Sequence, residues 1–504
     1  MAASSSVASD PGFLRLLLSR RSVIVALIVF LVIAGLCILA GWVAPMSPSK
    51  MSVRARLAPP FGDYLLGADA YGRDVLSRLL YAGRTSLTIG FGVATLSTVI
   101  GIAIGIYGLA QAVFQIPFGL LSDRVGRKPL IVFGLVIFCI GSIVAASTES
   151  IWGVIIGRAL QGSGAIAAAV MALLSDLTRE QNRTKAMAFI GVSFGITFAI
   201  AMVLGPIVTH ALGLHALFWM IAALATTGIV LTIWVVPNST SHVLNRESGM
   251  VKDSFSKVLA EPKLLKLNFG IMCLHILLMS TFVALPGQLA KAGFPAAEHW
   301  KIYLVTMLLS FVSVVPFIIY AEVKRKMKRV FLACVLLILI AEIVLWSANV
   351  RFWGLIAGVQ IFFLAFNLME ALLPSLISKE SPAGYKGTAM GVYSTSQFLG
   401  VAIGGSFGGW VVEMFDGQAV FLAGALLAAV WLLVASTMKE PPYVSSLRVE
   451  IPPEIAADDT LKQRLLAKEG ISEVLIVAKE HSAYVKIDSK VTNRFEVEQA
   501  ISQA

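Results

Sequence analysis

The sequence predicts an all-α polytopic membrane protein with twelve transmembrane helices, followed by a small α+β domain. Three observations lead to this prediction. Of the 504 residues, 57% are hydrophobic and only 14% are charged, which is unusual for a soluble domain. Apolar runs of about 20 residues recur along the chain, and each is long enough to cross the hydrocarbon core as a helix. From residue 445 onward these runs stop and short alternating segments take their place.

The first predicted span covers residues 22–44 and follows a basic segment that ends at Arg21. It is too long for the apolar region of a signal peptide, and no cleavage-site pattern follows it. We therefore interpret it as a signal anchor with a cytoplasmic N-terminus. A polar, proline-containing segment at 45–85 is expected on the outer side. The apolar stretch 86–121 comes next and is longer than one span requires.

The remaining ten predicted spans are separated mostly by short loops, and a longer polar stretch at 237–264 divides the twelve into six and six. They cover residues 130–147, 151–177, 184–210, 215–236, 265–289, 302–320, 330–347, 353–377, 387–412 and 419–437. Lys and Arg gather in alternate loops, which by the positive-inside rule places those loops and both termini in the cytoplasm. This distribution accounts for the net charge of +11 without a nucleic-acid partner.

The segment Tyr64–Leu87 has a specific sequence, YLLGADAYGRDVLSRLLYAGRTSL. It resembles the signature of the second permease subunit of dipeptide and oligopeptide ABC importers. The resemblance covers about residues 12–105 and does not continue, since the loop with which such permeases hold their ATPase is not found downstream. We infer that two sequences are joined near residues 98–106, and that 1–105 form an ABC-permease-like N-terminal segment.

A glycine-rich basic loop, GLLSDRVGRKP from Gly119 to Pro129, lies between two apolar runs. Its first glycine lets two helices approach closely, and its second glycine permits a tight turn. An acid among bases can form ion pairs in one conformation that break in another, as a gate requires. The residues concerned are Gly119, Asp123, Arg124, Gly126, Arg127 and Lys128. They match the loop 2–3 signature of the major facilitator superfamily, which this segment resembles, and we predict a gating role for them.

Two further segments resemble motifs of major facilitator antiporters. Arg158 lies deep in the predicted fourth span with Gln161 and Gly162 nearby, and a cation at that depth usually faces a cavity or a partner. The segment resembles the R-x-x-x-G pattern of helix 4, which implies a role in proton coupling. The fifth span matches the helix 5 antiporter motif in part, and helix packing with a proline kink explains that match nearly as well. The residues of this match are Gly191, Gly195, Gly205 and Pro206.

From about residue 101 onward the chain resembles major facilitators throughout. The resemblance implies a 6+6 fold with residues 106–236 as the rest of the N-terminal bundle and 237–264 as a cytoplasmic linker. Residues 265–440 form the C-terminal bundle. The first helix is atypical, because residues 22–44 stand in its place.

Family architecture places helices 1, 4, 7 and 10 around the central cavity, which directs attention to polar residues in those spans. The candidates for proton coupling or substrate binding are Arg158, Gln161, His275, Asn367 and Glu370, with Glu342 on the ninth span. Glu370 is the best candidate proton carrier, because burial disfavours the charged form of a carboxyl group. A hydrogen bond between helices is the alternative role for each of them.

Residues 445–504 predict a separate cytoplasmic domain. Strand patterns at 447–451, 474–478 and 483–487 alternate with helical patterns at 460–469 and from Asn493 to about Ser502. The βαββα order suggests a ferredoxin-like fold. Metal-binding domains of this fold use a CxxC motif, which this sequence lacks, so we expect no metal there.

The resemblance implies a bacterial inner-membrane secondary transporter. We expect proton-coupled efflux of a small amphipathic or drug-like molecule by alternating access, carried out by a monomer. Two alternatives remain: a fragment of a peptide ABC-importer permease, and a non-transporting sensor or scaffold that uses the C-terminal domain. The sequence has no Walker loop and no hydrolytic or metal-ligand constellation. We therefore expect no enzyme activity, no cofactor and no ATPase subunit as partner.

Overall fold

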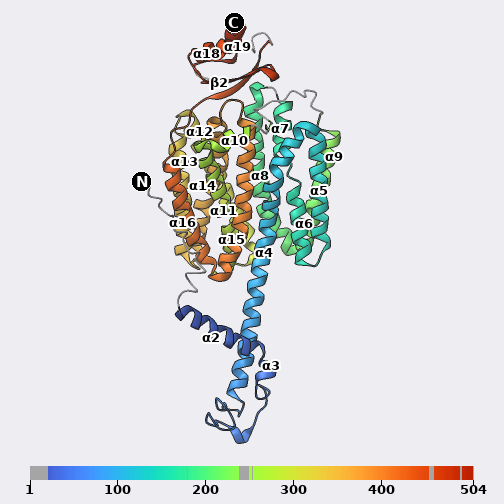
Figure 1. Ribbon diagram of the computed structural model, residues 1–504, viewed down its shortest axis with the longest axis vertical. Helices are drawn as coiled ribbons and strands as arrows, with labels where there is room; N and C mark the ends of the chain where they lie inside the picture. Colours follow the sequence, from blue (N-terminus) through green and yellow to red (C-terminus); the bar gives the residue numbers. More distant parts are fainter. Residues whose placement is uncertain are drawn as a thin grey trace, which may run out of the picture. The chain divides into compact units, whose positions relative to one another are not determined.

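The structure is a computed structural model, and it describes residues 21–178, 180–237, 249–251, 254–452, 459–488 and 491–502. The chain divides into two compact units, Met1–Leu96 and Ser97–Ala504, and each is described by itself. Figure 1 gives the labels of helices and strands that are used below.

The first unit consists of short helices and a structured loop. Its described elements are α2 (Arg21–Ile38), α3 (Ala40–Val43), the 3-10 helix η1 (Val53–Ala55) and the beginning of α4 (Val75–Val125). Cys37, Ala40 and Leu80 form a small buried cluster between these elements. The prediction of a helix at 22–44 is confirmed apart from a short interruption at Leu39, which separates α2 from α3.

Two aspartates order the loop that precedes α4. Asp74 caps the helix, because its Oδ2 accepts a hydrogen bond from the Ser77 backbone N–H at 2.8 Å, so α4 begins well before the long apolar stretch. Asp69 accepts from the backbone N–H groups of Tyr71 and Arg73 at 2.9 and 3.0 Å. Desolvation raises the pKa of Asp69, but these hydrogen bonds and the Arg73 guanidinium together hold it well below its usual range. The network therefore stabilises the loop above the ordinary titration range of a carboxyl group and is lost as the pH falls.

The second unit contains the rest of α4 and a large helix bundle. Its further helices are α5 (Arg127–Ser147), α6 (Ile151–Ser163), α7 (Ala167–Leu177), α8 (Glu180–Leu212), α9 (Leu214–Trp234), α10 (Phe255–Ala260), α11 (Pro262–Lys291), η3 (Ala296–Glu298), α12 (His299–Val323), α13 (Met327–Ala348), α14 (Phe352–Glu380), α15 (Lys386–Met414) and α16 (Gly417–Ser436). Within the described part of the chain, nine helical segments are long and apolar enough to cross a membrane. The polytopic helical fold is thus confirmed, whereas the count of twelve spans stays a prediction.

One predicted span is not a continuous helix. The expected helix over 151–177 is interrupted between Ser163 and Ala167, so that α6 and α7 are separate. A Cβ atom added at Gly164 would lie 2.6 Å from the Gly134 carbonyl oxygen, which shows that α5 passes directly against the interruption. The apolar composition predicted the span correctly, but it carried no information on this local break.

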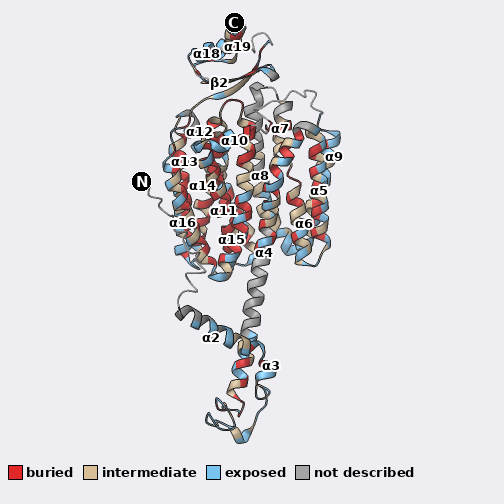
Figure 2. Ribbon diagram, in the orientation of Figure 1, coloured by how far each residue is buried: buried red, intermediate tan, exposed pale blue. Residues whose placement is uncertain are grey.

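Small residues allow the helices to approach closely. A Cβ added at Gly404 of α15 would lie 2.5 Å from the Ile276 carbonyl oxygen of α11, and one at Gly408 would lie 2.8 Å from Ser280 Cα. A Cβ at Gly105 of α4 would lie 2.7 Å from the Ala402 carbonyl oxygen of α15. Such contacts are typical of membrane helices, whose association depends on van der Waals packing. Buried residues are concentrated where the helices of the C-terminal half face one another (Figure 2).

The C-terminal domain contains a three-stranded sheet and two helices. Its elements are β1 (Ser445–Glu450), α18 (Asp459–Leu466), β2 (Ile471–Val477), the 3-10 helix η4 (Ala478–Glu480), β3 (Ser482–Ile487) and α19 (Arg494–Ser502). The strands lie in the order β1-β3-β2, and β3 is antiparallel to both neighbours. Asn493 caps α19, because its Oδ1 accepts from the Glu496 N–H at 3.0 Å. The elements follow the expected βαββα order, and the ferredoxin-like assignment stays a prediction.

The C-terminal domain contacts the loop between α12 and α13. The Arg325 Nη2 donates to both carboxylate oxygens of Asp488, at 2.9 and 3.1 Å. The same guanidinium lies over the ring of Tyr443, 5.2 Å from its centroid. The Tyr443 hydroxyl in turn accepts from the Met327 backbone N–H at 3.0 Å. The start of α13 is therefore tied to the segment that leads into the domain.

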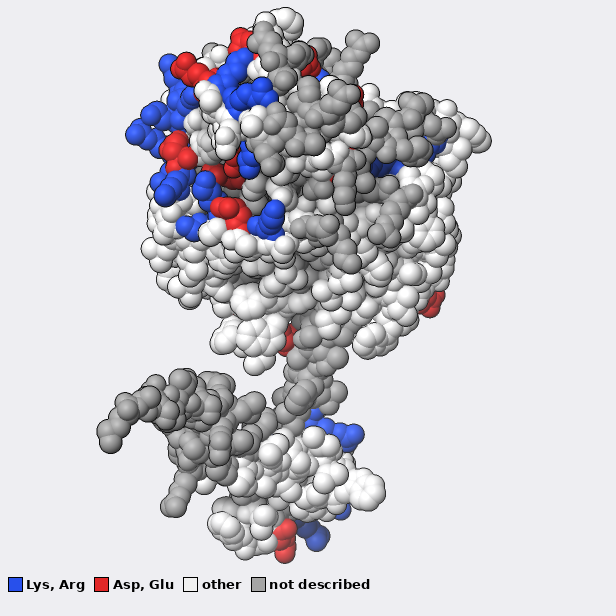
Figure 3. Space-filling view, turned by 45° about the horizontal axis from the view of Figure 1, so that its top comes forward, with Lys and Arg blue, Asp and Glu red and all other residues white. Residues whose placement is uncertain are grey.

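A second set of contacts joins the domain to the end of α14 and the loop that follows it. The Lys486 ammonium donates to the Lys379 carbonyl oxygen at 2.8 Å, where carbonyl groups near a helix end favour a cation. The Glu473 carboxylate accepts from the Ala383 backbone N–H at 2.9 Å. In Figure 3, charged residues of both signs gather at the end of the second unit that carries this domain, while the visible, described sides of the bundle are largely uncharged.

A charge swap tests whether the Arg325–Asp488 pair holds the domain. We expect Arg325→Asp alone and Asp488→Arg alone to increase protease cleavage in the connecting segment 439–444, because each leaves two like charges face to face. The double swap should restore the pair but not the contact of the Arg325 guanidinium with the Tyr443 ring, so its cleavage rate should lie between those of the single variants and the wild type. A partly exposed ion pair contributes about 0.2–1 kcal/mol, so the single changes should accelerate cleavage up to several-fold. Faster cleavage in the double variant than in either single variant would contradict a direct pair.

Candidate functional site

An acid and a buried histidine meet between α14 and α11. Glu370 Oε1 lies 3.3 Å from His275 Nε2, and the side chains of His275 and Glu370 are 7% and 34% exposed. Gln397 of α15 completes the group, with its Nε2 3.0 Å from His275 Nε2. The sequence predicted Glu370 and His275 separately as cavity residues, and the structure brings them together.

The hydrogen bonds around His275 determine where a proton could be added. His275 Nδ1 lies 3.2 Å from the Ile271 carbonyl oxygen, which can only accept, so we assign the ring proton to Nδ1. Nε2 then accepts from the Gln397 amide. Among the described residues, Glu370 Oε1 faces the same Nε2 without a hydrogen bond. A proton added to Nε2 could be donated to Glu370, whereas a protonated Glu370 could donate to Nε2 only in place of the Gln397 amide, because Nε2 has a single lone pair. The pair is therefore arranged to take up a proton.

Aromatic side chains surround the pair. Phe366 of α14 lies against the His275 ring, with 5.9 Å between ring centroids, and Phe198 of α8 lies 6.1 Å from Phe366. The N-terminal half therefore reaches the acid–histidine pair through α8. Tyr393 of α15 is 3% exposed, and its hydroxyl has no hydrogen-bond partner among the described residues.

Glu342 lies apart from this group and faces α16 and α11. It is 1% exposed, its Oε1 accepts from the Thr281 hydroxyl at 3.1 Å, and its Oε2 has no partner. A Cβ added at Gly424 would lie 2.6 Å from that Oε2. A neutral acid is therefore easier to accommodate here than a carboxylate.

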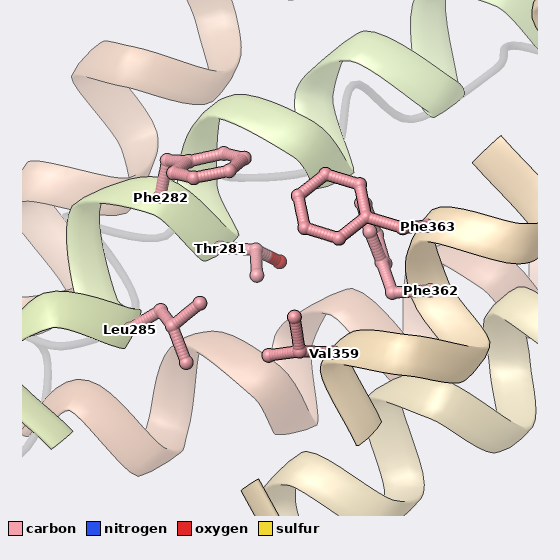
Figure 4. Close-up of a pocket in the computed structure, with 6 residues that line it drawn as sticks. All are labelled: Thr281, Phe282, Leu285, Val359, Phe362 and Phe363. Atoms are coloured by element: carbon pink, nitrogen blue, oxygen red, sulfur yellow. The ribbon is translucent and has the colours of Figure 1, made fainter. Parts of the chain in front are cut away.

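Thr281 also lines a small hollow between α11 and α14 (Figure 4). Thr281, Phe282 and Leu285 come from α11, and Val359, Phe362 and Phe363 come from α14. The lining is apolar and the hollow has no room for a water molecule. It cannot hold a substrate in this conformation, so Glu342 does not face a binding cavity through it.

Asn367 is 8% exposed and faces α12, where its Nδ2 lies 3.8 Å from Met307 Sδ. Gln360 donates to the Ser310 hydroxyl of the same helix at 3.0 Å. In the described part of the chain, neither residue is hydrogen-bonded to the acid–histidine pair. These contacts support the alternative role from the sequence analysis, in which such polar residues join neighbouring helices.

Arg158 is held between α6 and α4. Its guanidinium lies over the Tyr107 ring, 4.7 Å from the centroid, and its Nη1 donates to Gln161 Oε1 at 3.2 Å. Gln161 Nε2 then donates to the Ser142 hydroxyl of α5 at 2.8 Å. A Cβ at Gly162 would overlap the Tyr107 carbonyl oxygen, which explains why a glycine follows the arginine by one turn. The motif thus packs three helices around a cation.

The predicted gating loop is a tight turn between α4 and α5. Gly126 has φ +105°, a conformation that favours glycine. Arg127 Nη1 donates to the Ser122 hydroxyl at 2.6 Å. Lys128 Nζ donates to the Ile233 and Val236 carbonyl oxygens at 2.9 and 2.8 Å, so this lysine caps the end of α9. The side chains of Asp123 and Arg124 lie outside the described residues.

Gly119 contacts the linker between the two halves. A Cβ at Gly119 would lie 2.5 Å from Met250 Sδ, and one at Gly391 of α15 would overlap Met250 Cε. The Val251 backbone N–H donates to the Thr388 hydroxyl at 3.0 Å. Residues 249–251 therefore lie between α4 and α15, and Met250 fills the space that two glycines leave. No sequence pattern marks this methionine, since a single Met in a polar linker is unremarkable by type.

The helix 5 motif has a weaker structural basis. Gly191 and Gly195 belong to α8, but their surroundings lie outside what the structure describes. Gly205 has nothing within 4 Å of an added Cβ, so close packing does not require it here. Pro206 lies inside α8, which continues to Leu212.

The two helical halves and their buried polar groups define a class, the polytopic membrane transporters. The chain belongs to the major facilitator superfamily, whose family model matches residues 75–405 and 328–473. It is 84% identical over 405 residues to the inner membrane transport protein YajR of Escherichia coli, covering 80% of this chain and 89% of that protein. Residues 447–503 match the YajR YAM domain. The chain is thus a YajR-like transporter of the inner membrane and not an enzyme.

The N-terminal part has different relatives. Residues 12–60 match the N-terminal TM domain of oligopeptide transport permease C. A putative peptide transport system permease protein of Brucella suis is 37% identical over 127 residues, which cover 25% of this chain and 41% of that protein. The predicted resemblance to both families is confirmed.

Two other similarities concern the transporter part. A class H tetracycline resistance protein of Pasteurella multocida is 32% identical over 120 residues, covering 24% of this chain and 29% of that protein. The crystal structure of the nucleoside transporter NupG has a TM-score of 0.55 at 16% identity and covers 69% of this chain and 95% of that one. At this identity the structural likeness supports the fold alone.

Proposed function

We propose that the chain is a proton-coupled antiporter that exports a small amphipathic molecule by alternating access, with both termini in the cytoplasm. The observation that carries this proposal is the contact of Glu370 with His275. The two groups lie 3.3 Å apart without a hydrogen bond and need one proton to form it. A group that gains and loses one proton within a membrane-spanning helix is what a proton-driven carrier requires.

The place of this pair in the fold supports coupling between proton and substrate. The aromatic contact of Phe198 with Phe366 joins the N-terminal half to the helix that carries Glu370. A substrate that enters between the halves must separate such contacts, and a change of charge at Glu370 alters their surroundings. Binding between two helical halves is the general arrangement of alternating-access carriers.

The gating loop supports the same proposal at one end of the bundle. Met250 lies between Gly119 and Gly391, one from each half. Packed surfaces of this kind have two discrete arrangements and do not deform continuously. In the proposed cycle, the linker leaves this position when the halves separate at this end.

Other observations bear on the direction of transport and on the class of substrate. The similarity to a tetracycline resistance protein favours efflux, and it selects tetracycline as one probe. The aromatic residues beside a carboxylate favour a planar molecule that can carry positive charge, and ethidium is a probe of that kind.

Everted inner-membrane vesicles that contain the full chain test the proposal. Respiration acidifies the vesicle lumen, so an exporter should accumulate labelled tetracycline or ethidium against a gradient. We expect accumulation above that of vesicles without the chain, and we expect a protonophore to abolish it. Accumulation that persists with the protonophore would contradict proton coupling. No accumulation of either probe would contradict a drug-like substrate.

A further inference from the structure

The turn between α12 and α13 carries several cations without partners among the described residues. Segment 322–329 has five bases and one acid. Arg325 is paired with Asp488, and the side chain of Glu322 lies outside the described residues. The side chains of the other four bases form no hydrogen bond or ion pair with any described residue: Lys324, Lys326, Lys328 and Arg329.

Basic residues of other segments at the same end of the bundle are engaged within the protein. Lys128 caps the end of α9, and Lys263 pairs with the buried carboxylate of Glu380 at 3.2 Å. Lys257 donates to the Tyr385 hydroxyl at 2.9 Å. The positive-inside rule accounts for cations at this end of the helices. It does not explain why those of the α12–α13 turn lack partners while these three have them.

The turn holds its four cations at the membrane surface. The apolar span that contains α12 ends at Ala321, and that of α13 begins at Met327. The Lys326 backbone N–H donates to the Ala321 carbonyl oxygen at 3.0 Å, and Arg325 has φ +52°, so the chain reverses between the two spans. Long basic side chains at the end of a span reach the level of the lipid headgroups.

Two of the cations continue the exposed apolar faces of their helices. On α12, Lys324 follows Tyr320 by one helical turn, and Tyr320 is 48% exposed. On α13, Arg329 lies on the same face as Leu336 and Ile340, which are 45% and 39% exposed. Exposed apolar side chains on a membrane-spanning helix contact acyl chains. The cations therefore lie where a lipid that follows these faces has its headgroup.

From this arrangement we infer that the α12–α13 turn binds an anionic phospholipid. The phosphate accepts charge-assisted hydrogen bonds from the lysine and arginine side chains, and the acyl chains lie along the exposed faces of α12 and α13. A zwitterionic headgroup fits less well, because its own cation is repelled by the four positive charges. The inference goes beyond the proposed transport cycle and does not depend on the role of Glu370.

Native mass spectrometry of the purified full chain tests the inference. Dioleoyl phosphatidylglycerol and dioleoyl phosphatidylcholine are titrated separately, because they share acyl chains and a phosphate but differ in net charge. We expect phosphatidylglycerol to bind at least about tenfold more tightly. Lys324→Gln combined with Arg329→Gln should weaken its binding about 30-fold, since each cation near the membrane surface contributes a factor of about five in affinity. Binding of phosphatidylcholine should stay unchanged.

Two control variants separate the site from effects of total charge and of folding. Lys291→Gln combined with Arg351→Gln removes the same charge from exposed positions at the other end of these helices and should keep wild-type binding. Lys324→Arg combined with Arg329→Lys keeps both charges in the turn and should also bind like the wild type. An equal loss in the first control, or a full loss in the second, would overturn binding by the charges of this turn.

Photocrosslinking locates the lipid and separates it from free phosphate. A phosphatidylglycerol with a photoreactive acyl chain should label peptides of α12 and α13, and this labelling should fall in the variant with two glutamines. Equal affinity for the two lipids, or unchanged labelling in that variant, would contradict the inference. Displacement of the lipid by inorganic phosphate at the same concentration would show that the turn recognises phosphate alone, and the lipid site would be wrong.

Discussion

Replacement of Glu370 by glutamine is expected to abolish proton-driven accumulation while leaving the fold intact. Glutamine keeps the size of the side chain and its capacity to form hydrogen bonds, but it cannot gain or release a proton in the physiological range. The amide N–H can donate across the 3.3 Å contact to His275 Nε2 when the Gln397 amide gives up that position, as the protonated acid would. The variant should therefore be trapped in the equivalent of one protonation state.

Two measurements on vesicles follow the two halves of the cycle. Accumulation of ethidium or tetracycline under respiration should fall to the level of vesicles without the chain. Exchange of labelled for unlabelled probe without a gradient should also be reduced, because the substrate half of an antiport cycle uses the unprotonated acid, which glutamine does not mimic. Loss of both activities together with a lower unfolding temperature would show a folding defect and not a coupling defect.

The same change at Glu342 discriminates between the two acids. Glu342 bonds to Thr281 and faces α16, away from the acid–histidine pair. We expect Glu342→Gln to retain proton-driven accumulation. If it instead loses accumulation and Glu370→Gln does not, Glu342 is the carrier and the assignment to Glu370 is wrong.

The sequence was most informative where the bilayer restricts the chain. Apolar runs of sufficient length must be helices in lipid, and α5 (Arg127–Ser147) and α13 (Met327–Ala348) begin and end within a few residues of the expected bounds. The order of elements in the C-terminal domain was also predicted, because alternation and capping residues are local signals. Contacts between helices are not local. Glu370 and His275 were each identified because a polar group inside a membrane span costs free energy. Their pairing depends on how α11 and α14 are rotated about their axes, which composition does not determine.

The residues that sequence reasoning missed have ordinary types for their positions. Tyr393 lies in a glycine-rich helix, where an aromatic residue usually packs against lipid or a neighbouring helix. Met250 lies in a polar linker, where a single apolar residue has no periodicity to mark it. Their significance comes from the unpaired hydroxyl in the first case and from the two facing glycines in the second. Both features exist only in three dimensions.

Replacement of Gly387 by alanine is expected to open the bundle at the end that carries the gating loop. A Cβ at this position would overlap the Gly249 carbonyl oxygen, and a backbone atom cannot move aside as a flexible side chain can. The linker would then have to leave its place between α4 and α15, and the Val251–Thr388 hydrogen bond would be lost with it. Overpacking of this kind costs about 1–3 kcal/mol, which changes a two-state equilibrium by about 5- to 150-fold.

Distances between spin labels at Val125 and Lys324 measure this opening. Both residues are exposed. Val125 is the last residue of α4, and Lys324 directly follows α12. The labels are attached in a background in which the four native cysteines, Cys37, Cys139, Cys273 and Cys334, are replaced. Gly387→Ala should shift the distance distribution to longer values, whereas the wild type should keep the shorter distance.

Gly287→Ala of α11 is the control for this experiment, because nothing lies within 4 Å of a Cβ added there. Both substitutions exchange a helical glycine for alanine. Alanine is favoured by about 1 kcal/mol in a helix interior and by less at Gly387, the second residue of α15, so the control bounds the effect of helix propensity. A difference between the two variants therefore reports the overlap with Gly249 and not the propensity of the helix. If both variants give the wild-type distance, the linker moves aside without opening the bundle. Residues 249–251 would then not be part of the contact that closes this end of the bundle.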